Sequence, residues 1–461
     1  MPLELFDSHN HLYARDYDAD RDAVIERARG VGVVGMVCVA EDVETGRRCV
    51  EIANRYPEVY AAVGLHPHKA REDTDEHYAA LRELAQAEKK VVAIGEVGLD
   101  YHYEHSPREA QRDTFRRYLR LAHELGLPLI IHCREAHDDS LGILREAQHG
   151  PYRGVMHCYS GTAEEAQALL ELGFHISLAG PLTFKNARKP CEVAAAVPIE
   201  RLLIETDAPY LAPQRVRGKR NEPAYVTDVA QKLAEIKKLS VEDVGRVTTR
   251  NARVLFGIDF PASGDTLAYK IRDSLYLNIT NRCTNECIFC ARTSNPVVKG
   301  HDLRLTREPT AQEIIEAVGD PASFREVVFC GYGEPLIRLD VVKEVGKMLV
   351  ARGARRIRID TNGQANLVHG RNVVPELAPF ADEISVSLNA PDEAEYSRLC
   401  RSAHGAAAFE AVKAFIREAA EHIPAVVASV VAVPGLDIEA CRALAAELGA
   451  TFRVRPYNEV G

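Results

Sequence analysis

The sequence lacks the features of a membrane or secreted protein. No run of about 18 apolar residues occurs in its 461 residues, so we expect no membrane span. The first residues, MPLELFDSHNHLY, show neither the basic segment nor the apolar segment of a signal peptide. We therefore expect no signal peptide, no membrane partner and a cytoplasmic location.

An excess of positive charge is also absent. The formal net charge of −10 argues against non-specific coating of nucleic acid, so metals or a local basic patch would have to bind any phosphate. With 46% hydrophobic and 27% charged residues, the composition excludes a disordered or fibrous chain. The 11 cysteines are too sparse for a disulfide scaffold. Three of them cluster within eight residues, Cys283, Cys287 and Cys290, which points to a metal or iron–sulfur site.

Short apolar runs alternate with amphipathic stretches through the first half of the chain. The runs predict eight strands, at 3–12, 32–40, 59–66, 91–99, 128–134, 154–159, 174–179 and 202–208. Buried parallel strands joined by helices give an α/β fold, and eight such units predict a TIM-type (β/α)8 barrel. We assign this barrel to residues 1–258.

A segment with Pro, Gly and Ser at 259–269 is predicted to be a linker. After it the alternation resumes in residues 270–461. Six strands are predicted there, at 275–280, 326–333, 356–363, 383–390, 425–433 and 451–457. Six units are too few for an eight-stranded barrel, so we predict a partial (β/α)6 barrel.

Histidines and carboxylates stand at or near the ends of the predicted strands of the first half. His9 and His11 are two apart on a strand, so their side chains share a face. The other candidate ligands are Glu96, His132, His157 and Asp207. A lone strand histidine is usually a hydrogen-bonded core residue, but six such residues on five strands are typical of a barrel active site. The set suits Zn, Mn or Mg, and two ions could clamp the oxygens of a phosphodiester.

Residues 3–257 resemble the TatD family of metal-dependent deoxyribonucleases, within the amidohydrolase-like barrels. The matching stretches, in family order, are DSHNHL, GLHPH, IGEVGLDY, LPLIIHCREAHDD, HCYSG, ETDAPYLAP and RNEPAYV. The resemblance implies two divalent ions on these six ligands, with Glu96 bridging them and Asp207 assisting proton transfer. It also makes His66 and Glu205 candidates for catalysis, and DNA or a nucleotide the expected substrate.

A basic cluster follows the eighth predicted strand. Its members are Arg215, Arg217, Lys219 and Arg220. Such a run is either solvated surface or, beside metal ligands, a contact for phosphate.

The clustered cysteines directly follow a predicted strand, in LNITNRCTNECIFCAR. Three thiolates can hold three irons of a 4Fe-4S cluster and leave the fourth iron open. A structural zinc site would need four ligands, and no fourth Cys or His is near in the sequence. The spacing, with Phe289 before the last cysteine, resembles the radical SAM superfamily, and most closely the group associated with TatD nucleases, over about residues 270–461.

The same resemblance implies a site for S-adenosylmethionine at the following strand ends. In FCGYGEP, Gly331 and Gly333 permit close backbone approach, and Glu334 is expected to bind the amino group of the cofactor. Cys330 is expected to be a core residue. Further contacts are expected from Phe289 with the adenine and from Asn362, Ser385 and Ser387 with the ribose and the methionine carboxylate.

These observations predict a bifunctional enzyme, a two-metal phosphodiesterase joined to a radical SAM enzyme of unknown substrate. The second half would cleave S-adenosylmethionine with electrons from a donor such as flavodoxin or ferredoxin. Two alternatives stay open for the first half. It could hydrolyse amides or esters, or it could be a module that presents substrate to the second half, although a binding module need not keep all six ligands.

Overall fold

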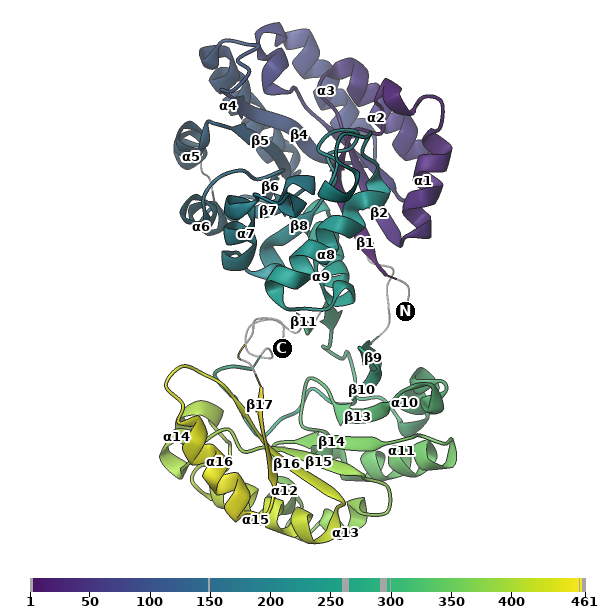
Figure 1. The fold of residues 1–461 in the computed structure, drawn as a ribbon, viewed down its shortest axis with the longest axis vertical. Helices are drawn as coiled ribbons and strands as arrows, with labels where there is room; N and C mark the ends of the chain where they lie inside the picture. The colour runs from purple at the N-terminus through teal and green to yellow at the C-terminus, as the bar shows by residue number, and fades with distance from the viewer. Residues whose placement is uncertain are drawn as a thin grey trace. The chain divides into compact units, whose positions relative to one another are not determined.

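The computed structural model describes residues 3–147, 150–258, 265–290, 297–298, 300–455 and 457. The chain divides into two compact units, residues 1–262 and 263–461. The division falls inside the predicted linker, of which residues 259–264 lie outside the described residues. Each unit has a sheet of its own (Figure 1).

The first unit is built on a parallel eight-stranded sheet whose spatial order follows the chain. Its strands are β1 (Leu5–Asn10), β2 (Val33–Val39), β3 (Val59–Val63), β4 (Val91–Asp100), β5 (Leu129–Arg134), β6 (Gly154–Met156), β7 (His175–Leu178) and β8 (Leu202–Ile204). Just beyond β8, Ala208 forms a parallel bridge with Asn10 of β1. This bridge joins the last strand to the first and confirms the predicted barrel.

Helices cover the outside of this sheet (Figure 1). They are α1 (Arg21–Gly30), α2 (Val43–Arg55), α3 (Asp75–Ala87), α4 (Arg108–Leu125), α5 (His137–Glu146), α6 (Ala163–Glu171), α7 (Arg188–Ala196), α8 (Val226–Lys237) and α9 (Val241–Phe256). The last helix begins at Ser240, whose side chain accepts the Asp243 N–H, and ends at the left-handed Gly257. Its Phe256 stacks on Phe6 of β1, with ring centroids 6.3 Å apart.

The long strand β4 places two acidic residues in the barrel. All ten of its residues are buried, and strand alternation puts Glu96, Gly98 and Asp100 on one face. Gly98 has a φ of +139°, and a Cβ there would lie 2.0 Å from the carbonyl oxygen of His132. Glycine is therefore required for β4 to approach β5 this closely beside His132.

The second unit contains a seven-stranded sheet in the order β17-β16-β15-β14-β13-β10-β9. The strands are β9 (Ala268–Ile271), β10 (Ser274–Asn278), β13 (Glu326–Cys330), β14 (Ile357–Thr361), β15 (Glu383–Ser387), β16 (Ala425–Val431) and β17 (Thr451–Arg455). β9 pairs antiparallel with β10, and the other neighbours are parallel. The six parallel strands are the predicted ones and fit a partial barrel. β9 begins within the stretch predicted to be linker.

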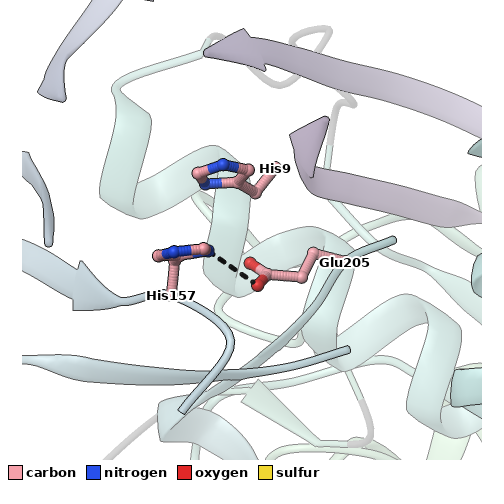
Figure 2. Close-up of side chains that lie close together, drawn as sticks. All are labelled: His9, His157 and Glu205. Atoms are coloured by element: carbon pink, nitrogen blue, oxygen red, sulfur yellow. Dashed lines mark ion pairs between the residues drawn. The ribbon is translucent and has the colours of Figure 1, made fainter. Parts of the chain in front are cut away.

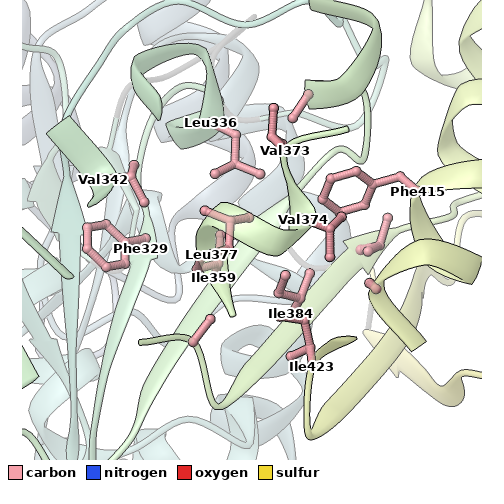
Figure 3. Close-up of a cluster of buried hydrophobic side chains, with 14 of the residues drawn as sticks. Phe329, Leu336, Val342, Ile359, Val373, Val374, Leu377, Ile384, Phe415 and Ile423 are labelled. Carbon is pink, nitrogen blue, oxygen red and sulfur yellow. The ribbon is translucent and has the colours of Figure 1, made fainter. Parts of the chain in front are cut away.

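One face of this sheet is apolar and packs against helices. Phe329, Ile359 and Ile384 belong to its buried cluster, which Figure 3 shows. The helices are α10 (Ala311–Val318), α11 (Leu339–Ala351), α12 (Ala365–His369), α13 (Val374–Leu377), α14 (Glu393–Cys400), α15 (Ala407–His422) and α16 (Ile438–Glu447). A small hairpin of β11 (Val297–Val298) and β12 (His301–Asp302) lies outside the sheet.

The residues of the opposite face alternate with the apolar ones and are largely polar. Arg358 is in register with Glu383 on the next strand, and Asp360 with Ser385. Arg358 pairs with Glu326 at 3.0 Å and with Asp360 at 2.9 Å. Among the described residues of the whole chain, no helix is both long and apolar enough to cross a membrane.

Candidate functional site

Four atoms that could bind a metal converge in the first unit, from β1 and the residue just after it, from β4 and from the segment after β8. His9 Nε2 lies 3.3 Å from His11 Nε2 and 3.5 Å from Glu96 Oε2. Asp207 Oδ1 lies 3.7 Å from His9 Nε2 and 3.2 Å from His11 Nε2. All four residues are buried. Asp207 adopts a left-handed φ of +57°, and its N–H bonds the carbonyl of His9 at 2.9 Å, which fixes the carboxylate at this point.

A second donor set meets the other oxygen of Glu96. Glu96 Oε1 lies 2.7 Å from His132 Nδ1 and 2.7 Å from His157 Nε2, and these two nitrogens are 3.2 Å apart. The two oxygens of one buried carboxylate thus face two different groups of ligand atoms. This is the arrangement expected of a carboxylate that bridges two cations.

Three histidines also place one ring nitrogen near an acceptor outside the cluster. His11 Nδ1 bonds the Val39 carbonyl at 2.9 Å, and His132 Nε2 bonds Asp100 Oδ2 at 3.0 Å. His157 Nδ1 lies 3.3 Å from Glu205 Oε1, within ion-pair distance but without a hydrogen bond. If these nitrogens carry the hydrogen of a neutral ring, the other nitrogen of each ring is the one that faces the cluster.

Figure 2 shows the His157 ring below that of His9, with an ion pair to Glu205 beside it. The rings of His9 and His157 stack with centroids 4.0 Å apart. Glu205 is fully buried; its Oε1 accepts the Cys158 N–H at 2.6 Å, and its Oε2 accepts from Ser8 Oγ at 3.3 Å. The carboxylate therefore has a fixed position from which it orients His157.

His66 has the opposite hydrogen-bond pattern. Its Nδ1 accepts the backbone N–H of His68 at 3.1 Å, and burial holds the pKa of His66 well below its usual value. The neutral ring therefore carries its hydrogen on Nε2, which lies 3.7 Å from Glu96 Oε1. This hydrogen bonding suits His66 to donate at the edge of the cluster, although its ring also lies close enough to Glu96 and His132 to share a metal ion with them.

In the second unit, the cysteine loop is attached to the ends of β14 and α14. The backbone N–H groups of Glu286 and Ile288 bond the carbonyls of Cys400 and Leu399, each at 3.0 Å. The buried Gln364 amide donates to Asn285 Oδ1 at 2.8 Å and to Tyr396 Oη at 2.9 Å. These bonds fix the path of the backbone between Cys283 and Cys290.

Glu334 connects the end of β13 to the end of β14. Its Oε1 accepts from the Leu336 N–H at 3.0 Å and from Thr361 Oγ1 at 2.8 Å, and its Oε2 accepts the Asn362 N–H at 2.6 Å. Burial raises the pKa of Glu334 to about 7. Asn362 in turn donates to Thr284 Oγ1 at 2.7 Å and lies 3.8 Å from Cys283 Sγ. Glu334 and Asn362 therefore lie beside the cysteine loop, as their predicted roles require.

Comparison with known proteins separates the two units. A family model described as TatD related DNase matches residues 6–257, more than half of the chain. This chain belongs to the TatD-related DNase family. A model of the radical SAM superfamily matches residues 277–448, so the second unit is a radical SAM domain. The protein is thus an enzyme with a metal-dependent hydrolase or nuclease domain and a radical SAM domain.

Individual relatives align over the TatD domain. The uncharacterized metal-dependent hydrolase YabD of Bacillus subtilis (strain 168) is 48% identical over 255 residues, 55% of this chain and 100% of YabD. The 3'-5' ssDNA/RNA exonuclease TatD of Escherichia fergusonii is 34% identical over 261 residues, 56% of this chain and 100% of the relative. The solved structure of the TatD homologue YJJV from Escherichia coli K12 is 30% identical, with a TM-score of 0.53, over 56% of this chain and 100% of that one.

Asp100 is a residue of the TatD site that the sequence reasoning missed. Its Oδ2 lies 3.0 Å from both His132 Nε2 and His68 Nε2. Although burial opposes its ionisation, the hydrogen bonds of these histidines hold the pKa of Asp100 below its usual range. Strand periodicity contained the signal, because Asp100 follows Glu96 by four positions and shares its face of β4.

Two of the four residues in the basic cluster after β8 are paired with carboxylates. Arg215 pairs with Asp228 at 2.9 Å, and Arg220 pairs with Asp20 at 2.7 Å. Arg217 covers the ring of Phe184 at 4.4 Å. These contacts make the cluster part of the domain surface and leave its two paired arginines less available to phosphate.

The structure changes two expectations for cysteines of the radical SAM domain. Cys400 hydrogen-bonds Cys287 and raises the pKa of its thiol, so a fourth sulfur does lie near the loop although it is distant in sequence. Cys330 is not in the apolar core. It lies on the face of β13 opposite Phe329, near Asp360, and burial raises its pKa to about 12.

The remaining predicted cofactor residues fall in three places. A Cβ on Gly333 would lie 2.3 Å from the Arg282 carbonyl oxygen, so this glycine allows the loop after β13 to pack on the segment entering the cysteine loop, and Gly331 packs likewise on Asn278. Phe289 is half-buried against the apolar cluster. Ser385 and Ser387 lie on the polar face of β15. There Ser387 Oγ accepts a hydrogen bond from Arg455 at 3.3 Å.

Proposed function

We propose that the TatD domain hydrolyses phosphodiester bonds of single-stranded DNA or RNA with two divalent ions. The observation that carries the proposal is the division of the two Glu96 oxygens between two donor sets. The two carboxylates of the site fit bound cations for a second reason. Within the described residues, neither Glu96 nor Asp207 has a Lys or Arg ion-pair partner, although both are buried. The exonuclease relative supports a nucleic-acid substrate.

The proposed ligands divide between the two ions. His9, His11 and Asp207 would hold one, His132 and His157 the other, and Glu96 would bridge them. Bound there, Zn, Mn or Mg ions would activate water and neutralise phosphate charge.

The neighbouring residues prepare and complete this site. Asp207 would accept the proton of the attacking water. Asp100 would fix the ring tautomer of His132 through its hydrogen bond, and Glu205 would orient His157 from ion-pair distance. His66, with its hydrogen on Nε2, would donate to a phosphoryl or leaving oxygen.

The test is hydrolysis by the full chain after metal removal and after return of each metal. Substrates are single-stranded oligonucleotides, duplexes, and small phosphate, carboxylate and amide esters. Asp207→Asn should lower the rate at least about 100-fold, the scale of a general base. Activity that survives complete chelation would contradict the metal role. Hydrolysis of amides or carboxylate esters alone would replace the phosphodiesterase assignment, and no hydrolysis at all would favour a substrate-presenting module.

We propose that the radical SAM domain binds a 4Fe-4S cluster on Cys283, Cys287 and Cys290 and cleaves S-adenosylmethionine. The match to the superfamily over residues 277–448 carries the proposal. The residues fit the group, because the loop that holds the three thiols is anchored by buried hydrogen bonds and Asn362 reaches Cys283. The cluster would supply the electron that breaks a carbon–sulfur bond of the cofactor, with flavodoxin or ferredoxin as the external donor.

The surrounding residues of this domain would bind the cofactor. Three donors already engage Glu334, which leaves room on Oε2 for the methionyl ammonium. The ribose and carboxylate would contact Asn362, Ser385 and Ser387, and the adenine Phe289.

Anaerobic reconstitution with iron and sulfide, followed by dithionite, tests the cluster and the reaction together. We expect about four irons per chain and release of 5'-deoxyadenosine. Cys287→Ala should abolish both. Cys400→Ser is the matched control because Cys400 also contacts Cys287 but lies outside the three-cysteine motif. A cluster that requires Cys400, or zinc in place of iron, would contradict the proposal and favour a structural four-sulfur site.

A further inference from the structure

Exposed aromatic rings lie on two sides of the donor cluster. Among the described residues of the TatD domain, Tyr103 and Tyr210 are the Phe or Tyr side chains exposed by half or more, at 52% each. Tyr103 follows β4, and its ring lies 5.7 Å from that of His68, a partner of Asp100. Tyr210 follows β8, and its ring lies 5.7 Å from that of the proposed ligand His11. Exposure of large rings is thus concentrated at the site.

An arginine without an acidic partner accompanies Tyr103. Arg134 ends β5 and follows His132 by two positions, so both side chains leave the strand on the same face. Its guanidinium lies over the Tyr103 ring, 4.6 Å from the centroid. Within the described residues 3–147 and 150–258, no carboxylate lies within ion-pair distance of Arg134, whereas Arg215 and Arg220 are both paired.

We propose that Tyr103 and Arg134 form a nucleotide subsite beside the donor cluster, and that Tyr210 forms a second base contact on its other side. Arg134 would bind a backbone phosphate next to the one that is hydrolysed, and the tyrosine rings would stack on nucleobases. At Tyr103 the base would take the place of the exposed His105 ring, which stacks on Tyr103 with centroids 5.6 Å apart. This inference rests on the proposed nuclease function and names the residues that would hold its single-stranded substrate beside the reacting phosphate.

The chemistry of the two groups explains this preference. A guanidinium presents planar paired N–H groups to a phosphate. Because Arg134 lies over the Tyr103 ring, a phosphate bound to Arg134 would lie beside a base that contacts Tyr103. A ring can stack on any base without reading its identity, but only if the base is free of a complementary strand. The subsite would therefore favour single strands and show little sequence preference.

The test measures binding without cleavage, with divalent ions chelated. The probe is a short oligodeoxynucleotide with one 2-aminopurine, whose fluorescence falls on stacking, and the protein is the full chain. Tyr103→Leu should remove the quenching and weaken binding at least about fivefold, whereas Tyr103→Phe should retain both, because stacking needs the ring and not the hydroxyl. Tyr210→Leu should likewise remove the quenching when the 2-aminopurine stands at a different position of the oligodeoxynucleotide.

Arg134→Gln should have a different signature. It should lower the slope of log Kd against log salt by about 0.7, the contribution of one phosphate contact to a single strand. Tyr103→Leu should leave that slope unchanged. The control pair is Tyr78 and Arg117 on the outer helices, which form the same kind of contact at 4.2 Å. Tyr78→Leu should alter neither quenching nor affinity.

The outcomes separate the subsite from the nuclease assignment. Oligonucleotide hydrolysis by the wild-type chain, with quenching and salt slope unchanged in all three site variants, would overturn the subsite alone. A wild-type chain that neither binds nor hydrolyses oligonucleotides would overturn both. Equal affinity for a duplex and a single strand would overturn the stacking role of the tyrosines.

Discussion

Glu205→Gln tests whether the TatD site depends on the orientation of its histidines. The glutamine must keep its oxygen at the position of Oε1, because the Cys158 N–H and His157 Nδ1 both meet that atom, at 2.6 and 3.3 Å. Its NH2 group then faces Ser8 Oγ, which can accept a hydrogen bond. The substitution therefore removes the charge opposite His157 while it preserves shape and hydrogen bonding.

The magnitude follows from the role of such carboxylates. Loss of the charged partner of a ligating histidine typically lowers metal affinity or activity about 10- to 100-fold, or about 1.4 to 2.7 kcal/mol. We expect this loss in the affinity for one of the two ions, measured by titration of metal-free protein. At saturating metal, oligonucleotide hydrolysis should recover most of its rate. Glu205→Ala should be more severe, because it also leaves the Cys158 N–H unpaired.

A buried carboxylate away from the histidines provides the control. Glu222 is also buried but pairs with Arg27 at 2.8 Å, so Glu222→Gln should affect stability without a change in metal affinity. Wild-type metal affinity in Glu205→Gln would refute the orientation argument. Unchanged affinity with a lost rate at saturating metal would instead assign Glu205 a direct part in the reaction.

Three further predictions concern pH, stability and metal binding. Because the pKa of Glu334 is raised to about 7, its carboxylate ionises as pH rises through that value. Affinity for S-adenosylmethionine should therefore increase up to about tenfold from pH 6 to pH 8 and then level off, and Glu334→Gln should flatten the profile. Phe329 is fully buried, so Phe329→Ala should destabilise the radical SAM domain by about 3 to 5 kcal/mol, and an unfolding scan should show the TatD transition unchanged. A divalent ion at about 100 times its Kd should stabilise the TatD domain by about 2.7 kcal/mol, and His11→Ala should remove that gain; equal unfolding midpoints with and without metal would contradict it.

The sequence predicts the two barrels because their strands carry local signals. A strand is recognised from its own buried apolar run, such as VVAIGEVGLD, and from the turn residues beside it, whatever its neighbours in the sheet. All eight predicted strands of the TatD domain are found in the structure. β9 was missed because it is a short edge strand, with Tyr269 as its one buried residue. Its pairing with β10 depends on a tertiary contact that no periodicity records.

The candidate ligands could be predicted, but the state of each ring could not. His66 and His132 look equivalent as strand-end histidines, yet a backbone N–H meets one and a carboxylate meets the other. That difference favours His66 as a hydrogen-bond donor and His132 as a metal ligand, and it depends on the path of the chain around them. Cys400 illustrates the same limit, since α14 brings it beside Cys287 from a distant part of the sequence.

The charge balance of the TatD site argues against its being a binding module alone. Buried carboxylates normally pair with Arg or Lys or are neutralised, because the low-dielectric interior penalises an isolated charge. Glu96 and Asp207 instead face imidazoles, and on the side away from the cluster His11 and His132 are hydrogen-bonded to Val39 and Asp100. His9 Nδ1 is buried with no hydrogen-bond partner among the described residues. Metal ions would neutralise these carboxylates and leave the imidazoles neutral. A domain that had lost metal binding would not need all six ligands, and this domain retains them.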